Sequence, residues 1–413
     1  MTRTLDEWLR WQESLHPRSI ELGLERVRSV AERLGLPDAR PLTLTIGGTN
    51  GKGSSAELAA LIYRHAGYRV GLYTSPHLLR YNERVRVDGA QAAEADLCRA
   101  FTAIEQARAQ TPLTYFEFGT LAALWLFREA AVDVQVLEVG LGGRLDAVNL
   151  VDADAALVTS IGLDHLDWLG TDREAIAREK AGIFRGGRPA IVAEPDPPHS
   201  LIATADALGA SLQQIGRDFG ALRRDGGFDW CGRRTLQALP LPALPGEAQL
   251  RNAAGVIAAV EALQHRCAVG DAAIHAALPR LALRGRCELR GRHVLDVAHN
   301  REAAEVVAAA LAALPPARPT VLVLGMLADK PHAAFVRALA AQIDAVVCVG
   351  LPGPRGLSAQ ALAAQLPADA HARCCDNMAE ALAVADALAA EQGRIVVTGS
   401  FLTVAAATIE LDG

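Results

Sequence analysis

The chain has 413 residues, which is too long for one ordinary hydrophobic core, so we expect two or three domains. Apolar residues make up 51% of it and charged residues 21%, and every long apolar run is broken by charge, Gly or Pro, so we expect no membrane-spanning segment. The net charge of −6 disfavours bulk binding of nucleic acid.

The N-terminal residues Met1–Trp8 lack the apolar block of a signal peptide. The seven cysteines are an odd number without paired Cys-x-x-Cys spacing, which indicates neither a disulfide framework nor a zinc site. For the adjacent Cys374 and Cys375, a redox-active pair is one interpretation; we favour a buried thiol beside an exposed one on a short strand. These features predict a cytoplasmic protein.

Residues 5–34 have the apolar spacing of helices, and the stretch Thr43–Ser54 then combines a short apolar strand with a glycine-rich turn. Glycines let successive backbone N–H groups point at one anion, while Lys52 and the start of the following helix add positive charge. The usual nucleotide-binding pattern has Ser or Thr directly after Gly-Lys, whereas Gly53 intervenes here. We interpret the turn as a phosphate-binding site; a plain glycine turn, with Ser54 as a helix cap, is the alternative.

Strands and helices alternate from this turn to residue 192, which predicts a parallel, doubly wound sheet. Residues 77–88 are rich in arginine without clear periodicity, and an ordered loop against a ligand and a solvated charged loop explain them equally well. Residues 218–249 consist of short polar-aromatic pieces with several prolines, which favours a small antiparallel insertion. The expected helices are Ser55–Ala66, Thr114–Ala130 and Asp172–Ile183, and the expected strands are Val70–Tyr73, Val132–Val139, Ala155–Ser160 and Ala190–Val192.

Helices are expected again over Asn252–Leu263 and Asp271–Leu278, followed by strands that alternate with Ala-rich helices. The expected strands are Val294–Val297, Val321–Gly325, Ala345–Val349 and Arg394–Thr398. The predicted fold class is therefore α/β, with an N-terminal P-loop-type doubly wound ATPase domain that carries a small antiparallel β insertion and a smaller C-terminal Rossmann-like α/β domain. The predicted bounds are residues 1–284 for the first domain, 285–290 for a hinge and 291–413 for the second domain.

Four side chains near strand ends are candidates for binding Mg²⁺, which prefers oxygen donors. Glu138 is the best of them, because a carboxylate at the end of a buried strand is costly unless it is paired or bound to metal. For His165, a surface histidine is the alternative, because nitrogen is not the preferred donor of magnesium. The four candidates are Ser54, Ser75, Glu138 and His165.

Other charged residues give weaker signals. From the residues alone, Lys180 is interpreted as a solvent-exposed helix lysine. Asp296 and His299 lie at the end of the first strand of the second domain, at the sheet edge where α/β proteins bind ligands. Arg286 is placed either to reach a triphosphate or to form an interdomain salt bridge.

Taken together, several motifs resemble the folylpolyglutamate synthase family over almost the whole chain. That family also has its serine one residue late in the glycine-rich turn, as Ser54 is here. The segments Leu5–Trp8 and Ile20–Arg26 are similar to the bacterial branch that also makes dihydrofolate, so a bifunctional enzyme is implied. The matching motifs are Gly48–Ser54, Thr74–Leu78, Arg80–Arg84, Tyr115–Thr120, Glu138–Asp146 and the stretch from Asp164-His165 through Glu179–Gly182.

The resemblance implies an ATP-dependent ligase that adds L-glutamate to dihydropteroate and to the γ-carboxylate of reduced folates through an acyl phosphate. It also implies two Mg²⁺ ions, and carbamylation of Lys180 by CO₂ to give a carboxylate-like metal ligand, which reverses the interpretation above. The implied catalytic residues are Lys52, Lys180 and His299. The implied ATP-binding residues are Thr49, Asn50, Gly51, Lys52, Gly53, Ser54, Asn252, Arg286 and Asp296; the metal ligands are Ser54, Ser75, Glu138, His165 and Lys180; and the residues at the pterin or glutamate are Ser75, Arg84, Phe116, Asp146, His299 and Ser400.

Three residues depart from the pattern of the family. Val297 stands where glycine is common, Ala248 where histidine is frequent, and Pro331 where aspartate is usual, and these positions bear on contacts to the ATP ribose and base and on a monovalent-cation site. Two other functions remain open, a Mur-type ligase acting on a UDP-muramyl substrate and a non-catalytic ATP-gated binding protein. The expected protein is a monomer that binds neither nucleic acid nor membrane.

Overall fold

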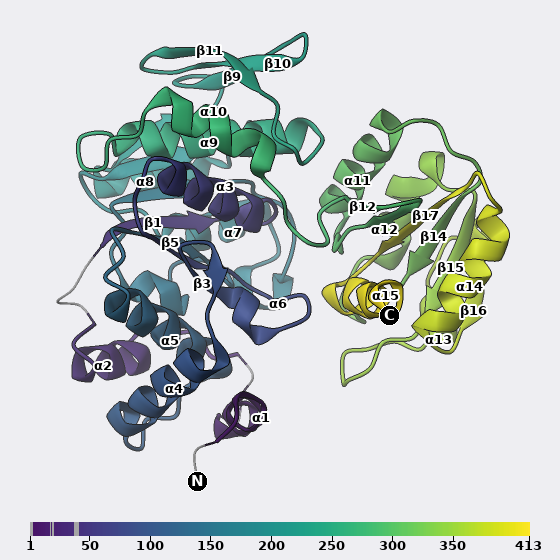
Figure 1. The fold of residues 1–413 in the computed structure, drawn as a ribbon, viewed down its shortest axis with the longest axis horizontal. Helices are drawn as coiled ribbons and strands as arrows, with labels where there is room; N and C mark the ends of the chain where they lie inside the picture. Colours follow the sequence, from purple (N-terminus) through teal and green to yellow (C-terminus); the bar gives the residue numbers. More distant parts are fainter. Residues whose placement is uncertain (1–2, 17, 19, 37–40) are drawn as a thin grey trace. The chain divides into compact units, whose positions relative to one another are not determined.

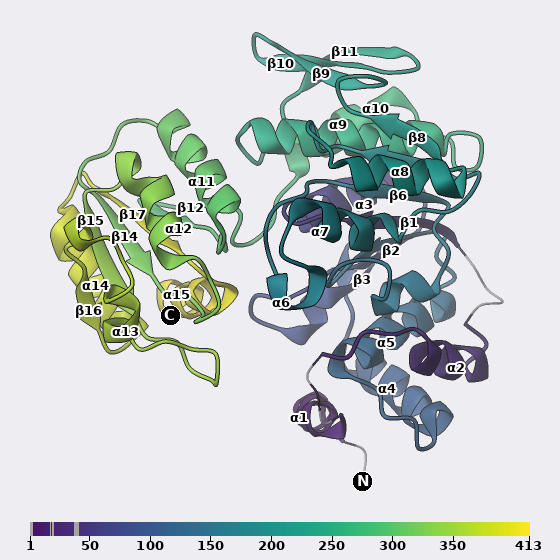
Figure 2. The ribbon, with the colours of Figure 1, turned by 180° about the vertical axis from the view of Figure 1, so that it is seen from behind.

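The computed structural model describes residues 3–16, 18, 20–36 and 41–413. The chain divides into two compact units, shown from two sides in Figures 1 and 2. The first unit comprises the residues up to Ala243 together with Gln249–Leu281, and the second comprises Leu244–Ala248 together with Ala282–Gly413. Both units are built from helices packed on a largely parallel sheet, which confirms the predicted α/β class.

The sheet of the first unit has the strand order β4-β3-β2-β5-β1-β6-β7-β8. Strand β1 lies between β5 and β6, pairs in parallel with both, and is buried along its whole length. Only β3 and β4, at one edge, run antiparallel to their neighbours. The strands are β1 Leu42–Gly47, β2 Val70–Tyr73, β3 Val85–Val87, β4 Ala90–Gln91, β5 Val134–Glu138, β6 Ala155–Val158, β7 Pro189–Val192 and β8 Ser211–Gln214.

Helices cover both faces of this sheet (Figure 1). Leu137 and Val158 share one core with apolar residues of α5, α7 and α8. Leu157 points to the opposite face, where an added Cβ at Gly255 of α9 would meet its side chain at 3.1 Å. The helices are α1 Leu5–Leu15, α2 Glu25–Arg33, α3 Lys52–His65, α4 Glu94–Arg108, α5 Tyr115–Glu129, α6 Leu166–Leu169, α7 Arg173–Ala181, α8 His199–Leu208, α9 Glu247–Ala262 and α10 Asp271–Ala277.

The structure differs locally from the sequence-based predictions in three places. Helix α3 begins at Lys52 and not at Ser55, because Gly51 takes the left-handed conformation (φ 85°) and lets the chain enter the helix directly from the turn. The stretch expected to be a loop over residues 77–88 contains the 3₁₀ turn Tyr81–Arg84 and strand β3. Helix α4, with its apolar residues on one buried face, was not predicted.

The predicted antiparallel insertion is confirmed as a three-stranded sheet of β9 Gly220–Arg224, β10 Gly227–Cys231 and β11 Thr235–Pro240. Phe228 and Trp230 of β10 are buried, and the indole N–H of Trp230 donates to the carbonyl of Ala254 in α9 at 3.0 Å. This contact attaches the small sheet to the helical layer of the first unit.

The sheet of the second unit has the order β12-β13-β17-β14-β15-β16 and is parallel except for the edge strand β12. Cys374 is exposed and Cys375 buried on the short edge strand β16, as expected. Among the described residues no helix is long and apolar enough to span a membrane. The elements are β12 Glu288–Arg290, β13 His293–Leu295, α11 Arg301–Ala313, β14 Thr320–Leu324, α12 His332–Leu339, β15 Ala345–Val349, α13 Ala359–Ala363, β16 Arg373–Cys375, α14 Met378–Ala389, β17 Arg394–Thr398 and α15 Phe401–Asp412.

Candidate active site

The turn between β1 and α3 requires glycine at two positions. Gly48 has a φ of 144°, and a Cβ there would lie 1.9 Å from the hydroxyl oxygen of Thr159. Gly51 has a φ of 85°, and a Cβ there would lie 2.7 Å from the side-chain amide of Asn252. The structure therefore places Asn252, predicted at the nucleotide, directly against the turn.

Residues that follow β6 hold this turn in shape. The backbone N–H of Thr49 donates to the carbonyl of Ser160 at 2.8 Å, and the hydroxyl of Thr159 donates to the carbonyl of Asn50 at 2.7 Å. Lys52 lies over the turn and donates to the carbonyl of Thr49 at 3.1 Å. Since the first N–H groups of α3 have no partner within the helix, the turn offers fixed donors and a cation to an anion.

Lys180 of α7 is buried beside the same turn, so the interpretation as a solvent-exposed lysine is wrong. Its ammonium donates to the carbonyl of Gly48 at 2.9 Å, and only 4% of the residue is exposed. Burial lowers the pKa of Lys180 to about 7, and the nearby charge of Lys52 acts in the same direction. A substantial fraction of Lys180 is therefore a neutral amine near pH 7.

Glu138 and Ser75 lie at the same edge of the sheet, at the ends of the adjacent strands β5 and β2. The carboxylate of Glu138 is buried and accepts the backbone N–H of Ser75 at 2.9 Å. Ser54 is also buried, in the first turn of α3. A carboxylate with two hydroxyl groups is an all-oxygen donor set, which fits Mg²⁺.

His165 differs from the other predicted metal ligands because it is exposed. It takes a left-handed conformation (φ 52°) immediately before α6, and its backbone N–H donates to Asp164 at 2.9 Å. In the described part of the chain, no group of three or more His, Cys, Asp or Glu side chains is placed to hold a metal ion. The donor set that we consider is therefore Glu138 with hydroxyl groups, and the role of His165 stays a prediction.

The structure brings together Phe116 and Asp146, two residues predicted at the pterin. An added Cβ at Gly140 would meet the ring of Phe116 at 2.6 Å and the carboxylate of Asp146 at 3.2 Å. Asp146 is buried and accepts the backbone N–H groups of Leu141 at 2.8 Å and of Val148 at 3.1 Å. Burial raises the pKa of Asp146 to about 7, so this carboxyl group is partly protonated near neutral pH.

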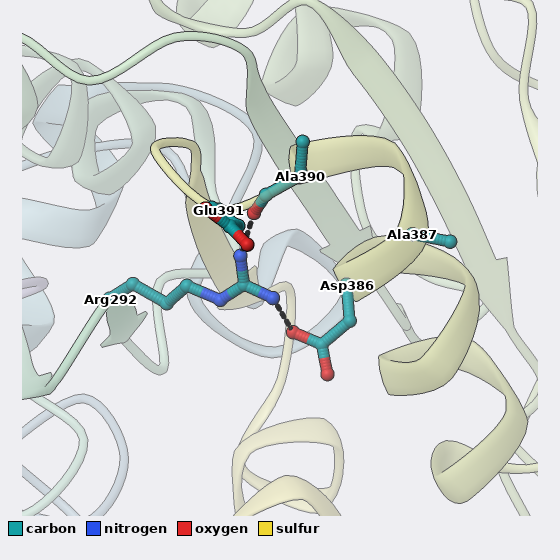
Figure 3. A pocket seen from close by; sticks show the side chains of 5 residues that line it. All are labelled: Arg292, Asp386, Ala387, Ala390 and Glu391. Carbon is teal, nitrogen blue, oxygen red and sulfur yellow. Dashed lines mark hydrogen bonds and ion pairs between the residues drawn. The ribbon is translucent and has the colours of Figure 1, made fainter.

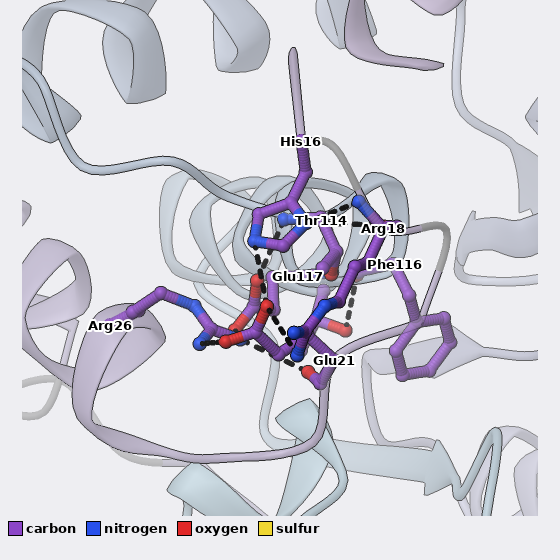
Figure 4. Close-up of polar contacts among 8 residues, drawn as sticks. His16, Arg18, Glu21, Arg26, Thr114, Phe116 and Glu117 are labelled. Carbon is purple, nitrogen blue, oxygen red and sulfur yellow. Dashed lines mark hydrogen bonds and ion pairs between the residues drawn. The ribbon is translucent and has the colours of Figure 1, made fainter. Parts of the chain in front are cut away.

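A polar network of His16, Glu21 and Arg26 lies against the first turn of α5, beside Phe116 (Figure 4). The guanidinium of Arg26 donates to Glu117 at 3.1 Å and to Glu21 at 2.7 Å, and His16 lies 3.2 Å from Glu21. Glu117 also accepts the backbone N–H of Thr114 at 2.7 Å and so completes the N-terminal cap of the helix. Sequence reasoning did not identify this network, because Thr114-x-x-Glu117 indicates only a helix cap.

Replacing Glu117 with glutamine should lower the free energy of unfolding by about 1 to 3 kcal/mol, because Arg26 loses a buried carboxylate partner. Urea denaturation measures this change. Glu129→Gln is the matched control, since Glu129 pairs with Arg128 at the exposed end of the same helix and should cost less than about 1 kcal/mol. Equal shifts of the urea midpoint in both variants would contradict a special role for the buried pair.

The arginine-rich stretch is ordered and contacts aromatic rings. The carboxylate of Glu83 accepts the backbone N–H groups of Leu78, Leu79 and Arg80 at 2.7 to 2.9 Å. The guanidinium of Arg84 lies 5.4 Å from the ring centre of Tyr81 and 5.5 Å from that of Tyr115, and it donates to Nδ1 of His77 at 2.8 Å. Of the two interpretations, the ordered loop is confirmed, while its contact with a ligand stays a prediction.

Burial and then the charge of Arg84 lower the pKa of His77 to about 4. Between pH 6.5 and 4 the unfolded chain therefore binds a proton at this residue that the folded chain does not bind, so stability should fall as the pH falls through this window. Urea titrations at several pH values should show that His77→Gln reduces this slope. An unchanged slope in the variant would show that His77 does not contribute.

In the second unit, three predicted residues follow β13 and β17 at the carboxyl edge of the sheet, and a fourth, Arg286, comes just before the edge strand β12. Asp296 is buried and accepts the backbone N–H groups of Cys287 and Ala298, both at 2.8 Å, and burial raises the pKa of Asp296. Nδ1 of His299 lies 2.9 Å from the carbonyl oxygen of Val297. Because a carbonyl only accepts, Nδ1 of His299 is the donor in this hydrogen bond.

Ser400 and Arg286 complete this group. Ser400 is buried and caps α15, with its hydroxyl oxygen accepting the N–H of Thr403 at 3.0 Å. The guanidinium of Arg286 lies 5.4 Å from the ring centre of Phe401, the first residue of α15. Of the departures from the family pattern, Val297 is buried and donates to the carbonyl of Gly285 at 2.9 Å, and Pro331 directly precedes α12.

An open pocket in the second unit lies elsewhere (Figure 3). Its walls come from Arg292, before β13, and from the end of α14, where Arg292 donates to Asp386 and to the carbonyl of Ala390. This is the amino end of the parallel strands, whereas ligands of α/β sheets bind at the carboxyl end. We therefore do not assign the active site to this pocket.

Comparisons with known proteins agree with the fold. Residues 46–218 match the family model of the Mur ligase middle domain, and residues 280–401 match that of the Mur ligase glutamate ligase domain. The class is therefore that of the Mur-type ligases, which are ATP-dependent. Within it, the chain belongs to the dihydrofolate synthase/folylpolyglutamate synthase family, since the Escherichia coli enzyme of that name is 46% identical over 407 residues, covering 97% of this chain and 94% of the relative.

Solved structures of relatives share the whole fold. The structure of E. coli FolC in complex with DHPP and ADP has a TM-score of 0.95 and 44% identity, and covers 99% of this chain and 98% of that one. A bifunctional folylpolyglutamate synthase/dihydrofolate synthase with Mn, AMPPNP and L-glutamate bound has a TM-score of 0.93 and 45% identity, and covers 100% of this chain and 99% of that one. The architecture of both units therefore matches that of this family.

Proposed function

We propose that the protein forms dihydrofolate from dihydropteroate and L-glutamate and extends reduced folates at the γ-carboxylate, using ATP and an acyl-phosphate intermediate. The observation that carries this proposal is the buried Lys180 on the carbonyl of Gly48, beside a glycine-rich turn and the buried carboxylate of Glu138. The bifunctional relatives and their complexes with nucleotide, DHPP and glutamate support the choice of substrates.

The chemistry brings anions together, because a carboxylate must attack a triphosphate, so the barrier is largely electrostatic. Lys52 and the N–H groups at the start of α3 bind the phosphates, and Arg286 neutralises charge on the transferring group. Glu138, Ser54 and Ser75 would hold Mg²⁺, which supplies further positive charge to the phosphate oxygens. Asn252 lies against Gly51 and so keeps the turn in its binding conformation.

The second half of the reaction is attack of the glutamate amine on the acyl phosphate. His299, whose Nδ1 donates to the carbonyl of Val297, accepts a proton at Nε2 from the glutamate ammonium group, and the free amine then attacks the acyl carbon. The tetrahedral intermediate then expels phosphate, and the amide bond remains. Ser400 and Asp296 hold the backbone at this edge, and the predicted hinge at 285–290 would let the domains close around the substrates.

Lys180 is proposed to be carbamylated. The neutral amine attacks CO₂, a C–N bond forms, and one proton leaves to solvent, so a buried cation becomes an anion that can support a second Mg²⁺. Two features of this lysine support the step: its burial and its pKa of about 7, which keeps much of the amine neutral. A monomeric state, a cytoplasmic location and a role of His165 at the metal remain predictions.

The experiment is an assay with ATP, Mg²⁺ and L-glutamate, in which dihydropteroate, tetrahydrofolate and a UDP-muramyl acceptor are compared. We expect ADP and a glutamyl conjugate with the first two acceptors and neither with the third. Product with the UDP-muramyl acceptor alone would assign a peptidoglycan ligase instead. Binding of ATP without glutamate-dependent release of ADP for any acceptor would indicate a non-catalytic binding protein.

A further inference from the structure

Phe401 is the first residue of α15 and follows Ser400 at the carboxyl end of β17. Its ring contacts two residues that have proposed roles in the reaction. The guanidinium carbon of Arg286 lies 5.4 Å from the ring centre, and the ring centre of His299 lies 6.4 Å away at an interplanar angle of 50°. All three residues belong to the second unit, so this arrangement does not depend on where the first unit lies.

Arg286 makes few other contacts. In the described part of the chain its guanidinium has no hydrogen bond and no carboxylate within ion-pair distance, although the charge of Asp296 lies close enough to attract it. An arginine has five N–H donors, and the side chain is long and flexible. The face of Phe401 therefore restricts the position of the Arg286 guanidinium together with the charge of Asp296, and it leaves the N–H donors of Arg286 available to a ligand.

We propose that Phe401 is a positioning residue, whose ring holds the Arg286 guanidinium over its face and packs against the ring of His299. One aromatic side chain then orients both Arg286, which binds the triphosphate, and His299, which acts on the glutamate amine. The inference rests on the proposed function, because it assigns the ligand of Arg286 as the triphosphate. The contact with Arg286 depends on the negative face of an aromatic ring, whereas the packing against His299 depends only on bulk.

Substitutions of Phe401 can therefore distinguish a need for an aromatic face from a need for apolar bulk. Phe401→Leu keeps an apolar side chain but removes the aromatic face, and it should lower kcat/KM for ATP by about 3- to 30-fold. Phe401→Trp and Phe401→Tyr keep the face and should stay within about 3-fold of the unaltered protein. Leu402→Ala is the matched control, because Leu402 is the next residue of the same helix and is 45% exposed.

A double-mutant cycle tests whether Phe401 acts through Arg286. If Phe401 acts through Arg286, then adding Phe401→Leu to Arg286→Ala should change kcat/KM for ATP by less than about 2-fold. If the two substitutions lower kcat/KM for ATP independently, so that their fold-changes multiply in the double variant, the proposal is overturned. Equal losses of kcat/KM in Phe401→Leu and Phe401→Trp would also overturn it. A Phe401→Leu protein as active as the unaltered one would overturn it as well.

Equilibrium binding of AMPPNP, measured without acceptor or glutamate, distinguishes failure of the proposed function from failure of the positioning role of Phe401. Phe401→Leu should weaken this binding and Phe401→Trp should not. If the unaltered protein binds AMPPNP but transfers no glutamate, the proposed function fails while the binding data still decide the role of Phe401. If transfer occurs and neither kcat/KM nor binding responds to Phe401→Leu, the positioning role alone fails. Thermal unfolding of each variant shows whether the fold is retained.

Discussion

Replacing Lys180 with alanine should reduce kcat by about 10³-fold or more, because the site loses the group that becomes a carbamate and supports the metal. The buried ammonium lies on the carbonyl of Gly48, so its removal changes the site directly beside the glycine-rich turn. Short carboxylic acids such as formate and acetate should restore part of the activity, since they can place a carboxylate in the space that the side chain leaves.

Two further variants make this result specific. Lys180→Arg keeps a cation but cannot form the carbamate, so it should be as inactive as Lys180→Ala. Arg178→Ala changes an exposed cation on the same helix and should retain full activity. Full activity of Lys180→Ala in the absence of added acids would contradict carbamylation of Lys180. Full activity of Lys180→Arg would contradict it as well.

Replacing Glu138 with glutamine should lower kcat/KM for ATP by at least about 10²-fold and raise the Mg²⁺ concentration needed for half-maximal activity. Glutamine has nearly the same shape, and its carbonyl oxygen can still accept the N–H of Ser75, so the loss reports the missing charge. A titration with Mg²⁺ at fixed ATP measures the effect. Glu94→Gln, at an exposed position of α4, serves as the control, and an unchanged Mg²⁺ dependence of Glu138→Gln would remove Glu138 from the metal site.

The sequence predicted the central features of the fold because they follow from local patterns. Apolar strands ending in glycines or acidic residues indicated β1 and β5, and the change to polar-aromatic pieces indicated the small antiparallel sheet. The start of α3 was placed three residues late, because Gly51 takes a left-handed conformation and packs against the side chain of Asn252, about 200 residues further along the chain. Such long-range packing leaves no signal in the turn itself.

In the candidate site, too, some residues could be predicted from local patterns and others could not. The glycine-rich turn and Glu138 could be proposed from residue types alone, but Lys180 could not, because a lysine in a charged helix is usually exposed. Arginine supplies almost all other positive charge, and Lys52, Lys180 and Lys330 are the only lysines, so this scarcity was a usable signal. It also marks Lys330, which is buried after β14 and was not among the predicted site residues.

Contacts between distant side chains escaped sequence reasoning altogether. The pair of Arg26 and Glu117 joins residues 91 positions apart, and the ring of Phe401 meets Arg286 across the sheet edge of the second unit. Neither contact follows from spacing, because the first depends on how α2 packs against α5 and the second on which strand ends the topology brings side by side.

The most direct test of the proposed reaction follows the oxygen atoms of the acceptor. If dihydropteroate labelled with ¹⁸O in its carboxylate is used with ATP and glutamate, an acyl phosphate requires one labelled oxygen to leave with phosphate as the amide forms. We predict one ¹⁸O atom in each phosphate released, together with dihydrofolate. Phosphate free of label, or release of ADP without a glutamyl conjugate, would contradict the mechanism.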